Sequence, residues 1–520
     1  MSTPHRQAAA ADPAYANYVL GVLVLVYVFN FLDRQILSIL NDHIKADLGL
    51  TDAQMGFLFG TVFAVFYALF GIPLGRLADV WDRRLLISIG LALWSVMTAV
   101  SGLARNFTQL AAARVGVGVG EASASPAAFS ILSDYFPAAR RATVLAIYSS
   151  GIYLGAGTGL MIGGQIVDRW DVSFAGSATP FGLRGWQVAF FVVGLPGLFL
   201  ALWVRTLREP VRGSADGIAT RSEPHPFREF FRELRAVIPP LTLWNLHASG
   251  GGAAVGRNLG VAAVLAVAAA VLVWVTGDAA QWTALGIGLY AAASWAQAIV
   301  LRDPPSAHLI LRTPSLRWSA LGFAFLAFTG YGIGYWVPPF LLRFHNATTA
   351  DVGLIAGGTS AAAGWLGVTC GGVLADRWRQ HSPVGRLNVG LLTAVATLPL
   401  AVWLLTTPSL ALAYLLNFPV TMFSSMWIGA GASTVQDLVL PRMRAVASAA
   451  YLLVITFIGL ALGPYTIGKL SVLLGSLRWG MLIGLVANLI ALAMFLLARP
   501  HLAHDEATMR QRVTAAGEKS

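Results

Sequence analysis

The sequence predicts an all-α membrane protein with about fourteen transmembrane helices. Of its 520 residues, 57% are hydrophobic and only 11% are charged, which is too little charge to cover a soluble protein of this size. Apolar runs of 18 or more residues recur along the chain, and about 20 residues at 1.5 Å each cross a hydrocarbon layer of roughly 30 Å. Composition and run length together therefore favour a multi-pass protein.

The apolar runs form a group of six, a pair and a second group of six. A polar, arginine-rich stretch at 207–250 follows the first group. We expect an N-terminal six-helix bundle in 1–206, a cytoplasmic linker with two inserted transmembrane helices in 207–313, and a C-terminal six-helix bundle with a tail in 314–520. The predicted helices lie near 17–41, 54–77, 85–104, 107–136, 142–167, 186–206, 257–276, 281–301, 315–342, 350–375, 386–406, 409–436, 445–470 and 478–498.

Basic residues in the loops predict the orientation. An even helix count places both termini on one side, and most Lys and Arg, such as Arg76 and Arg140, then share that side. Because cytoplasmic loops carry the basic excess, both termini are expected in the cytoplasm. The alanine- and arginine-rich composition favours a bacterial inner membrane. The net charge of +11 is spread over short loops, which argues against a nucleic-acid surface.

Two charged loops indicate an internal repeat. The stretch Gly75–Arg84, GRLADVWDRR, lies between the second and third helices and returns in short form, as GVLADR, at Gly372–Arg377. Four further residues recur 304 positions later: Pro137, Arg140, Gly155 and Gly159 return as Pro441, Arg444, Gly459 and Gly463. Two copies of one six-helix unit explain both recurrences.

These residues resemble the major facilitator superfamily. Its loop between helices 2 and 3 is matched by Gly75, Leu77, Asp79, Arg83 and Arg84, whereas Val80 and Asp82 depart from it. Its helix-4 arginine motif is matched by Arg114, Gly118 and Gly120, and its glycine-proline motif by Gly459, Gly463 and Pro464. Three segments resemble the Spinster-like branch: 30–34 (NFLDR), 118–122 (GVGEA) and 330–340. The resemblance does not cover 207–313, because that branch normally has twelve helices.

The resemblance implies a major-facilitator fold, with two six-helix bundles around a central cavity that opens alternately to each side. The Spinster-like branch implies a lipid cargo with one polar head, such as a lysophospholipid, and coupling to protons. We therefore expect a secondary active transporter of an amphipathic solute. Its expected partners are that small-molecule or lipid substrate, protons and membrane lipids, without ATP or nucleic acid. No Walker sequence is present.

Four charged residues lie inside the predicted helices: Asp33, Arg34, Arg114 and Glu121. Each costs roughly 2.5–3.5 kcal/mol at a helix centre unless it is paired, hydrated or functional. Asp33 and Arg114 lie at matching depths, so their spacing predicts an ion pair. Burial raises a carboxyl pKa and a nearby arginine lowers it. We interpret Asp33 and Glu121 as proton-coupling sites with Arg114 as their switchable partner. The alternative is a static cluster that locks helices 1 and 4 together.

The second group of helices carries aromatic and Met residues in place of such charges. An apolar cargo tail fits adaptable surfaces of this kind, although ordinary helix packing explains each residue as well. The predicted substrate-cavity residues are Arg34, Arg114, Tyr331, Tyr335, Trp336, Met426 and Trp427.

The repeated loops are interpreted as a gating latch. Asp79 is expected to cap a helix of the opposite half, and Arg83 to pair with Asp134. The alternative is a simple basic excess in cytoplasmic loops. The predicted gating residues are Gly75, Asp79, Arg83, Arg84, Asp134, Asp376, Arg377 and Asp437.

Other chemistry is not indicated. The nine histidines lack metal-ligand spacing, so neither a metal nor a cofactor is expected, and no nucleophile–base arrangement points to an enzyme. Two alternatives to the lysolipid transporter stay open. One is an exporter of unrelated organic anions or drugs, and the other is a non-transporting membrane receptor on the same scaffold. A membrane enzyme is a remote third.

Overall fold

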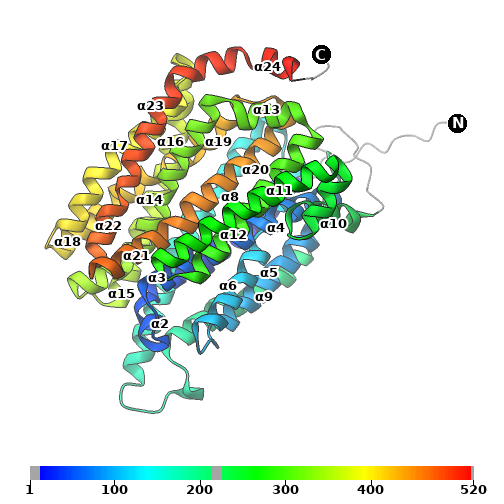
Figure 1. Ribbon diagram of the computed structural model, residues 1–520. Coiled ribbons are helices and arrows are strands. Elements are labelled where there is room, and N and C mark those ends of the chain that lie inside the picture. Colours follow the sequence, from blue (N-terminus) through cyan, green and yellow to red (C-terminus); the bar gives the residue numbers. More distant parts are fainter. Residues whose placement is uncertain (1–11, 214–224, 517–520) are drawn as a thin grey trace.

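The computed structural model describes residues 12–213 and 225–516, and the described residues fold into helices joined by short loops. Fourteen helical spans in this part of the chain are long and apolar enough to cross a membrane (Figure 1). The predicted all-α fold class is therefore confirmed, and each span overlaps one predicted helix.

The first six spans form the first half of the molecule. They are α1 (Pro13–Ile39), α3 with α4 (Asp52–Phe59 and Thr61–Val80), α5 (Arg83–Ser101), α6 with α7 (Phe107–Glu121 and Ala124–Tyr135), α8 (Ala138–Ser173) and α9 (Gly185–Arg205). The short helix α2 (Asn41–Leu48) links the first two spans.

The last six spans form the second half. They are α14 (Pro314–His345), α16 (Gly357–His381), α17 (Gly385–Thr406), α18 with α19 (Leu410–Ser425 and Trp427–Asp437), α20 with α21 (Arg444–Val454 and Gly463–Leu474), and α22 with α23 (Leu477–Gly484 and Val486–Ala507). The short helix α15 (Thr349–Asp351) lies between α14 and α16, and α24 (Met509–Ala515) follows the last span. One π-helical turn, Val352–Ala356, precedes α16, and a second, Ile455–Leu462, joins α20 to α21.

The inserted pair consists of α11 (Leu241–Thr276) and α12 (Ala279–Arg302). Two short helices flank it, α10 (Pro226–Val237) and α13 (Pro304–Arg312). α11 consists of two helical segments that meet at a kink at Gly251, whose φ of +64° is not helical, so a segment that begins at Leu241 precedes the helix predicted at 257–276. The stretch expected to be polar linker is thus partly helical.

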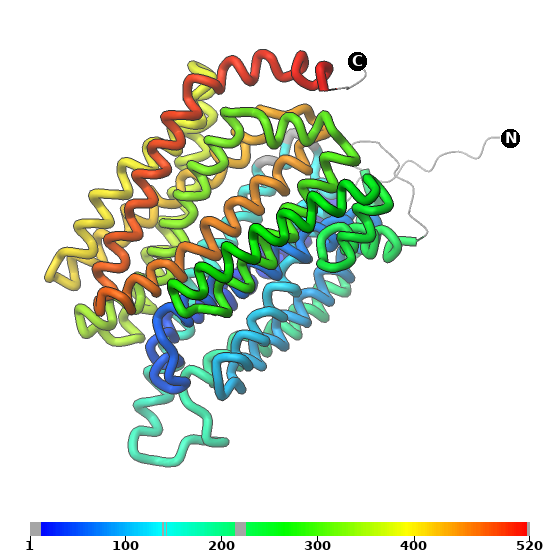
Figure 2. Tube along the Cα trace, in the orientation of Figure 1, coloured from blue at the N-terminus to red at the C-terminus, as the bar shows by residue number. Residues whose placement is uncertain are grey.

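Figures 1 and 2 show both ends of the chain at one end of the bundle and α2 and α15 at the other. We call the first end the terminal face and the second the loop face. The helix ends carry the expected capping signals. Thr51 and Gln54 form a capping box at α3, and Asp82 caps α5 by accepting a hydrogen bond from the Leu85 amide.

Glycines on α6 let two neighbouring helices approach closely. A Cβ at Gly118 would lie 2.9 Å from the Phe63 carbonyl oxygen on α4. A Cβ at Gly120 would lie 2.7 Å from the Gly90 carbonyl oxygen and 2.9 Å from Trp94 on α5. Because α6 also carries Arg114 and Glu121, this packing holds those charges deep in the first half.

Gly120→Val is expected to destabilise the first half by about 1–3 kcal/mol, because the added methyl groups meet backbone that cannot yield. Thermal unfolding in detergent, together with the yield of monodisperse protein, measures the effect. Gly21→Val is the matched control, since a Cβ there meets nothing within 4 Å. Equal unfolding temperatures for the two variants would contradict the close α5–α6 packing.

Candidate functional site

A buried ion pair joins α1 to α6. Arg34 donates from Nη2 to Glu121 Oε2 at 2.6 Å, and both side chains are almost fully buried. The Arg34 guanidinium also lies over the rings of Phe63 and Phe31, with 4.2 and 4.6 Å to the ring centroids. Ring faces attract a cation, so the aromatic contacts offset part of the cost of removing Arg34 from water.

The predicted Asp33–Arg114 ion pair is not formed in the structure. Both residues are fully buried, and they lie within electrostatic reach of each other and of Glu121. Asp33 instead lies near Trp94 and Thr98 of α5. Neighbouring helix positions point about 100° apart, so when Arg34 faces α6 its neighbour must face elsewhere. Residues at equal depth can face different helices. Depth alone therefore could not predict that Arg34, and not Asp33, points toward α6.

The remaining charges have unsatisfied hydrogen-bonding groups. All three Arg114 side-chain nitrogens and both Asp33 carboxylate oxygens are buried without a hydrogen-bond partner among the described residues. The four charges together are two cations and two anions, so the cluster is neutral overall. Buried charge without hydrogen bonds is costly. The unpaired Arg114 nitrogens and Asp33 oxygens are therefore available to bind a proton, water or a charged ligand.

Tyrosines surround this cluster. The Tyr67 ring centroid lies 5.7 Å from the Arg34 guanidinium carbon, and Tyr27 stacks on Tyr148 at 4.4 Å. Tyr331 of α14, a predicted cavity residue, is half-buried and lies within electrostatic reach of Arg34. The cluster therefore brings together side chains from both halves, and its tyrosines present hydroxyl groups next to a cation.

The loop face is closed by a polar gate between the halves. Arg343 at the end of α14 pairs with Asp42 at 2.5 Å and with Asp52 at 2.7 Å. Asn41 donates to the Tyr335 hydroxyl at 2.7 Å. Among the described residues, these Arg343 pairs are the ion pairs that join the two halves directly. No local sequence pattern marks this gate, because the fold brings together residues about 300 positions apart.

The terminal face has ion pairs within each half instead. Arg83 pairs with Asp134 at 2.5 Å, as predicted, and also with Glu209 at 2.6 Å, which was not predicted. In the second half, Arg386 pairs with Asp437. Both the Arg83–Asp134 and the Arg386–Asp437 contacts span 51 positions, so the repeat places equivalent pairs in the two halves. Arg386 occupies the position in the second half that is equivalent to Arg83, so the repeat could have identified it as the partner of Asp437.

The other predicted gating residues lie near these pairs. Arg84 donates to the Leu207 carbonyl oxygen at 2.7 Å, and Asp376 lies 3.5 Å from Arg386. Gly75 packs beside Pro126, and Arg377 is exposed, so its role in a latch stays a prediction. The expected cap by Asp79 on the opposite half is not formed in this conformation and stays a prediction. Its carboxylate is exposed and lies 3.5 Å from Arg76 on the same helix.

Comparison with known proteins decides the family. The Major Facilitator Superfamily model matches residues 23–464. The chain belongs to the Major Facilitator Superfamily. An MFS-type efflux pump of Mycolicibacterium smegmatis is 27% identical over 459 residues, which is 88% of this chain and 85% of the relative. Protein spinster homolog 1 of Xenopus tropicalis is 24% identical over 478 residues, covering 88% of this chain and 74% of the relative.

A solved structure places the chain within the superfamily. A bacterial homologue of the human lysosomal transporter Spinster, in an inward-facing and occupied conformation, is 26% identical. Its TM-score is 0.70, and the match covers 95% of this chain and 99% of that one. The chain is therefore a major-facilitator transporter of the Spinster-like branch, as its motifs predicted.

Four predicted cavity residues of this Spinster-like chain are packed inside the protein in the present conformation. Tyr335 and Trp336 are fully buried at the loop-face gate, and Trp336 donates to the Pro464 carbonyl oxygen at 2.9 Å. Met426 and Trp427 are buried within the second half, where Trp427 stacks on Phe323. Their contact with substrate stays a prediction.

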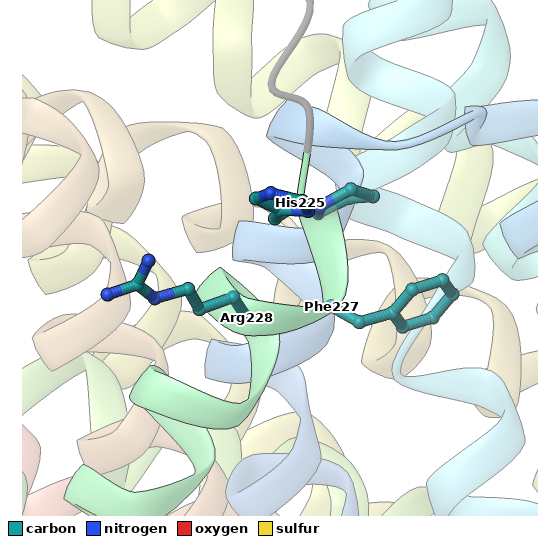
Figure 3. A pocket seen from close by; sticks show the side chains of 4 residues that line it. His225, Phe227 and Arg228 are labelled. Carbon is teal, nitrogen blue, oxygen red and sulfur yellow. The ribbon is translucent and has the colours of Figure 1, made fainter.

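A surface cavity of about 410 Å³ lies at the start of α10, lined by His225, Pro226, Phe227 and Arg228. Figure 3 shows Phe227 and Arg228 pointing to opposite sides of the chain there. All four lining residues come from one turn, and none belongs to the buried cluster. The candidate site of the Spinster-like chain is therefore the charge cluster between α1 and α6 and not this cavity.

Arg34→Met is expected to destabilise the protein by about 3–5 kcal/mol, because it leaves Glu121 buried without its partner. The double variant Arg34→Met with Glu121→Gln is expected to recover most of that loss. Thermal unfolding of the two single variants and the double variant gives the coupling free energy. Arg184→Ala is the control, since it removes an exposed pair with Asp47 that is worth at most about 1 kcal/mol. A double variant as unstable as the sum of the singles would contradict an energetically coupled pair.

Proposed function

We propose that this transporter couples protons to the movement of an amphipathic, anionic, lysolipid-like solute by alternating access. The observation that supports it best is the buried Arg34–Glu121 pair beside Arg114 and Asp33, which lack hydrogen-bond partners among the described residues. In this proposal the terminal face is cytoplasmic in a bacterial inner membrane, following the positive-inside rule. The moving bundles are 1–206 and 314–520.

Protonation of Glu121 is the first step. A proton on its carboxyl group removes the negative charge that faces Arg34, and the ion pair becomes a weaker hydrogen bond. Arg34 and Arg114 then present two cationic side chains balanced only by Asp33. An anionic head group that binds between them restores neutrality. When Glu121 loses its proton, it competes for Arg34 and favours release.

This revises the predicted roles without changing the proton-coupling residues. Asp33 and Glu121 remain the proposed proton sites, but Arg34 replaces Arg114 as the partner that switches. Arg114 is proposed to bind the head group, because its nitrogens have no other partner among the described residues. Tyr331, which is half-buried and within electrostatic reach of Arg34, is proposed to contact cargo from the second half.

The closed loop face supports a cycle in which access to the site alternates between this face and the terminal face. Arg343, Asp42 and Asp52 close the loop face. At the other end Asp79 is exposed and does not reach the second half. Closing the terminal face would let Asp79 form its predicted cap while the Arg343 pairs break.

The proton gradient is large enough to drive such a cycle. One proton moving across about 100 mV and one pH unit releases about 3.7 kcal/mol, enough for a roughly 500-fold concentration gradient of cargo. A single coupling carboxyl group is therefore sufficient.

Glu121→Gln is expected to abolish the response of transport to a pH gradient while keeping exchange of labelled for unlabelled cargo. Uptake of a labelled lysophospholipid into proteoliposomes, with and without the gradient, measures both activities. Asp351→Asn is the control, because Asp351 is exposed on α15 and belongs neither to the charge cluster nor to the predicted gating residues. If the two variants respond to the gradient alike, Glu121 is not the coupling site. Binding without exchange in the wild type would favour the receptor alternative.

An exporter of unrelated organic anions or drugs is the second candidate, favoured by the similarity to the mycobacterial MFS-type efflux pump. Proton coupling at Glu121 is compatible with it. The two candidates differ in what binds beside Arg114 and in whether an apolar tail contributes to affinity.

A competition series separates these candidates. For a lysolipid-like cargo, each added CH₂ in the tail of an unlabelled competitor is expected to lower its inhibition constant by about twofold to fourfold, because up to about 0.8 kcal/mol is gained per buried CH₂. Removing the anionic head should weaken competition at least as strongly. Inhibition that does not depend on tail length and is strongest for aromatic anions would favour the exporter.

A further inference from the structure

The inserted helix α12 lies on the seam between the two halves. Figure 2 shows the α11–α12 pair in green between the blue first half and the orange α20 and α21. At Gly288 of α12, an added Cβ would meet Val65 of α4 at 3.1 Å and Phe457 of the α20–α21 turn at 2.7 Å. α12 is therefore packed against both bundles at once, although the Spinster-like pattern has no such helix.

The start of α12 is held tightly by the second half. Asp278 pairs with Lys469 of α21 at 2.8 Å and accepts a hydrogen bond from the Tyr465 hydroxyl at 2.7 Å. Lys469 also donates to the Thr276 carbonyl oxygen at 2.5 Å. Trp282 packs edge-on against the Tyr465 ring. We call these contacts the second-half clasp.

Within the same first turn, the helix is also held by the first half. The Thr61 hydroxyl of α4 donates to Gln281 Oε1 at 2.7 Å, and both side chains are buried. Thr61 also lies 2.8 Å from the Ala461 carbonyl oxygen of the second half. The Thr61–Gln281 bond is the first-half clasp. Since the two clasps lie three residues apart on α12, that turn connects α4 to α21.

The clasps lie where the halves approach most closely. An added Cβ at Gly60 of α4 would lie 2.5 Å from the Leu460 carbonyl oxygen, and one at Gly56 would clash with the Pro464 backbone. All of these residues belong to the half of the membrane span nearer the loop face. Opening the loop face must separate α3 and α4 from α21. One turn of a rigid helix cannot keep both clasps while its two partners separate.

We propose that the first turn of α12 is a strap that positions the two halves by holding the loop face closed, and that it must release one clasp in each transport cycle. The inference rests on the alternating access proposed above, but not on the identity of the cargo or on proton coupling. The inserted pair is thereby an active part of the transport machinery, and not a passive peripheral attachment.

Anchors at the terminal face support a strap over passive packing. α10 is tied to the first half by the Arg76–Glu229 pair at 3.3 Å and by the contact of Phe227 with Trp81. α13 is tied to the second half by the Arg442–Asp303 pair at 3.1 Å. The insertion is therefore attached to both bundles at both ends of the membrane. A pair that only filled space against lipid would not need attachments to each half.

Distance measurements between spin labels test the strap. Cys370, the single cysteine, is replaced by Ser, and labels are placed through Arg105→Cys and Thr406→Cys, two exposed loop-face positions in opposite halves. Asp278→Ala removes the Lys469 and Tyr465 contacts to the carboxylate of the second-half clasp, and Gln281→Leu removes the hydrogen bond of the first-half clasp. Each variant is expected to raise the ratio of open to closed loop-face distances about threefold or more, because it removes a polar contact that favours the closed state.

The double variant is the decisive arm. Two clasps in series act as one strap, so cutting both is expected to shift the ratio no further than cutting one. Two independent packing contributions would instead add. Trp274→Leu, at a lipid-exposed residue of α11 near the same turn, is the control and should leave the ratio unchanged.

The outcomes separate the strap from the proposed function. Additive shifts, or single variants that match Trp274→Leu, would overturn the strap while leaving alternating access intact. A wild type with one fixed distance at every pH, with and without labelled lysophospholipid, would overturn alternating access and the strap with it. Size-exclusion profiles exclude variants that fail to fold.

Discussion

The ion pair between Arg34 and Glu121 is the interaction on which the site depends. A membrane interior gives buried charges no water, so each must be neutralised by protein, proton or ligand. The pair connects α1 to α6, and the ring of Phe63 on α4 lies against the same guanidinium. Helices α1, α4 and α6 therefore all contact the same ion pair. Any change in that balance changes how these helices pack, which is the coupling that a proton-driven carrier requires.

The helical architecture could be predicted because the membrane imposes length and composition on each span. Fourteen apolar runs gave fourteen spans, and loop capping residues such as Thr51 and Asp82 stand where chain turns were expected. The start of α11 was missed for a local reason. The stretch before Arg257 is rich in Gly and polar residues, which favour a loop, yet a helical segment that begins at Leu241 precedes the kink at Gly251.

The site was predicted only in part, because spacing along one helix fixes depth but not direction. Asp33 and Arg34 lie at nearly equal depth, and only the packing of α1 decides which one faces Glu121. The Arg83–Asp134 contact was easier, since both residues stand at helix ends on the same face. The loop-face gate was out of reach, because nothing in the local sequence around Arg343 points to Asp42 or Asp52, residues of the other half.

The repeat separates what the two halves share from what each adds. Arg83–Asp134 and Arg386–Asp437 are equivalent pairs 303 positions apart, so the helix-end contacts belong to the duplicated unit. The four buried charges of the cluster lie in the first half alone. The insertion between the halves belongs to neither copy. A segment at that junction can lengthen without disturbing the core of either bundle. Each of its ends leads into a different half, so a relative movement of the two halves acts directly on this segment.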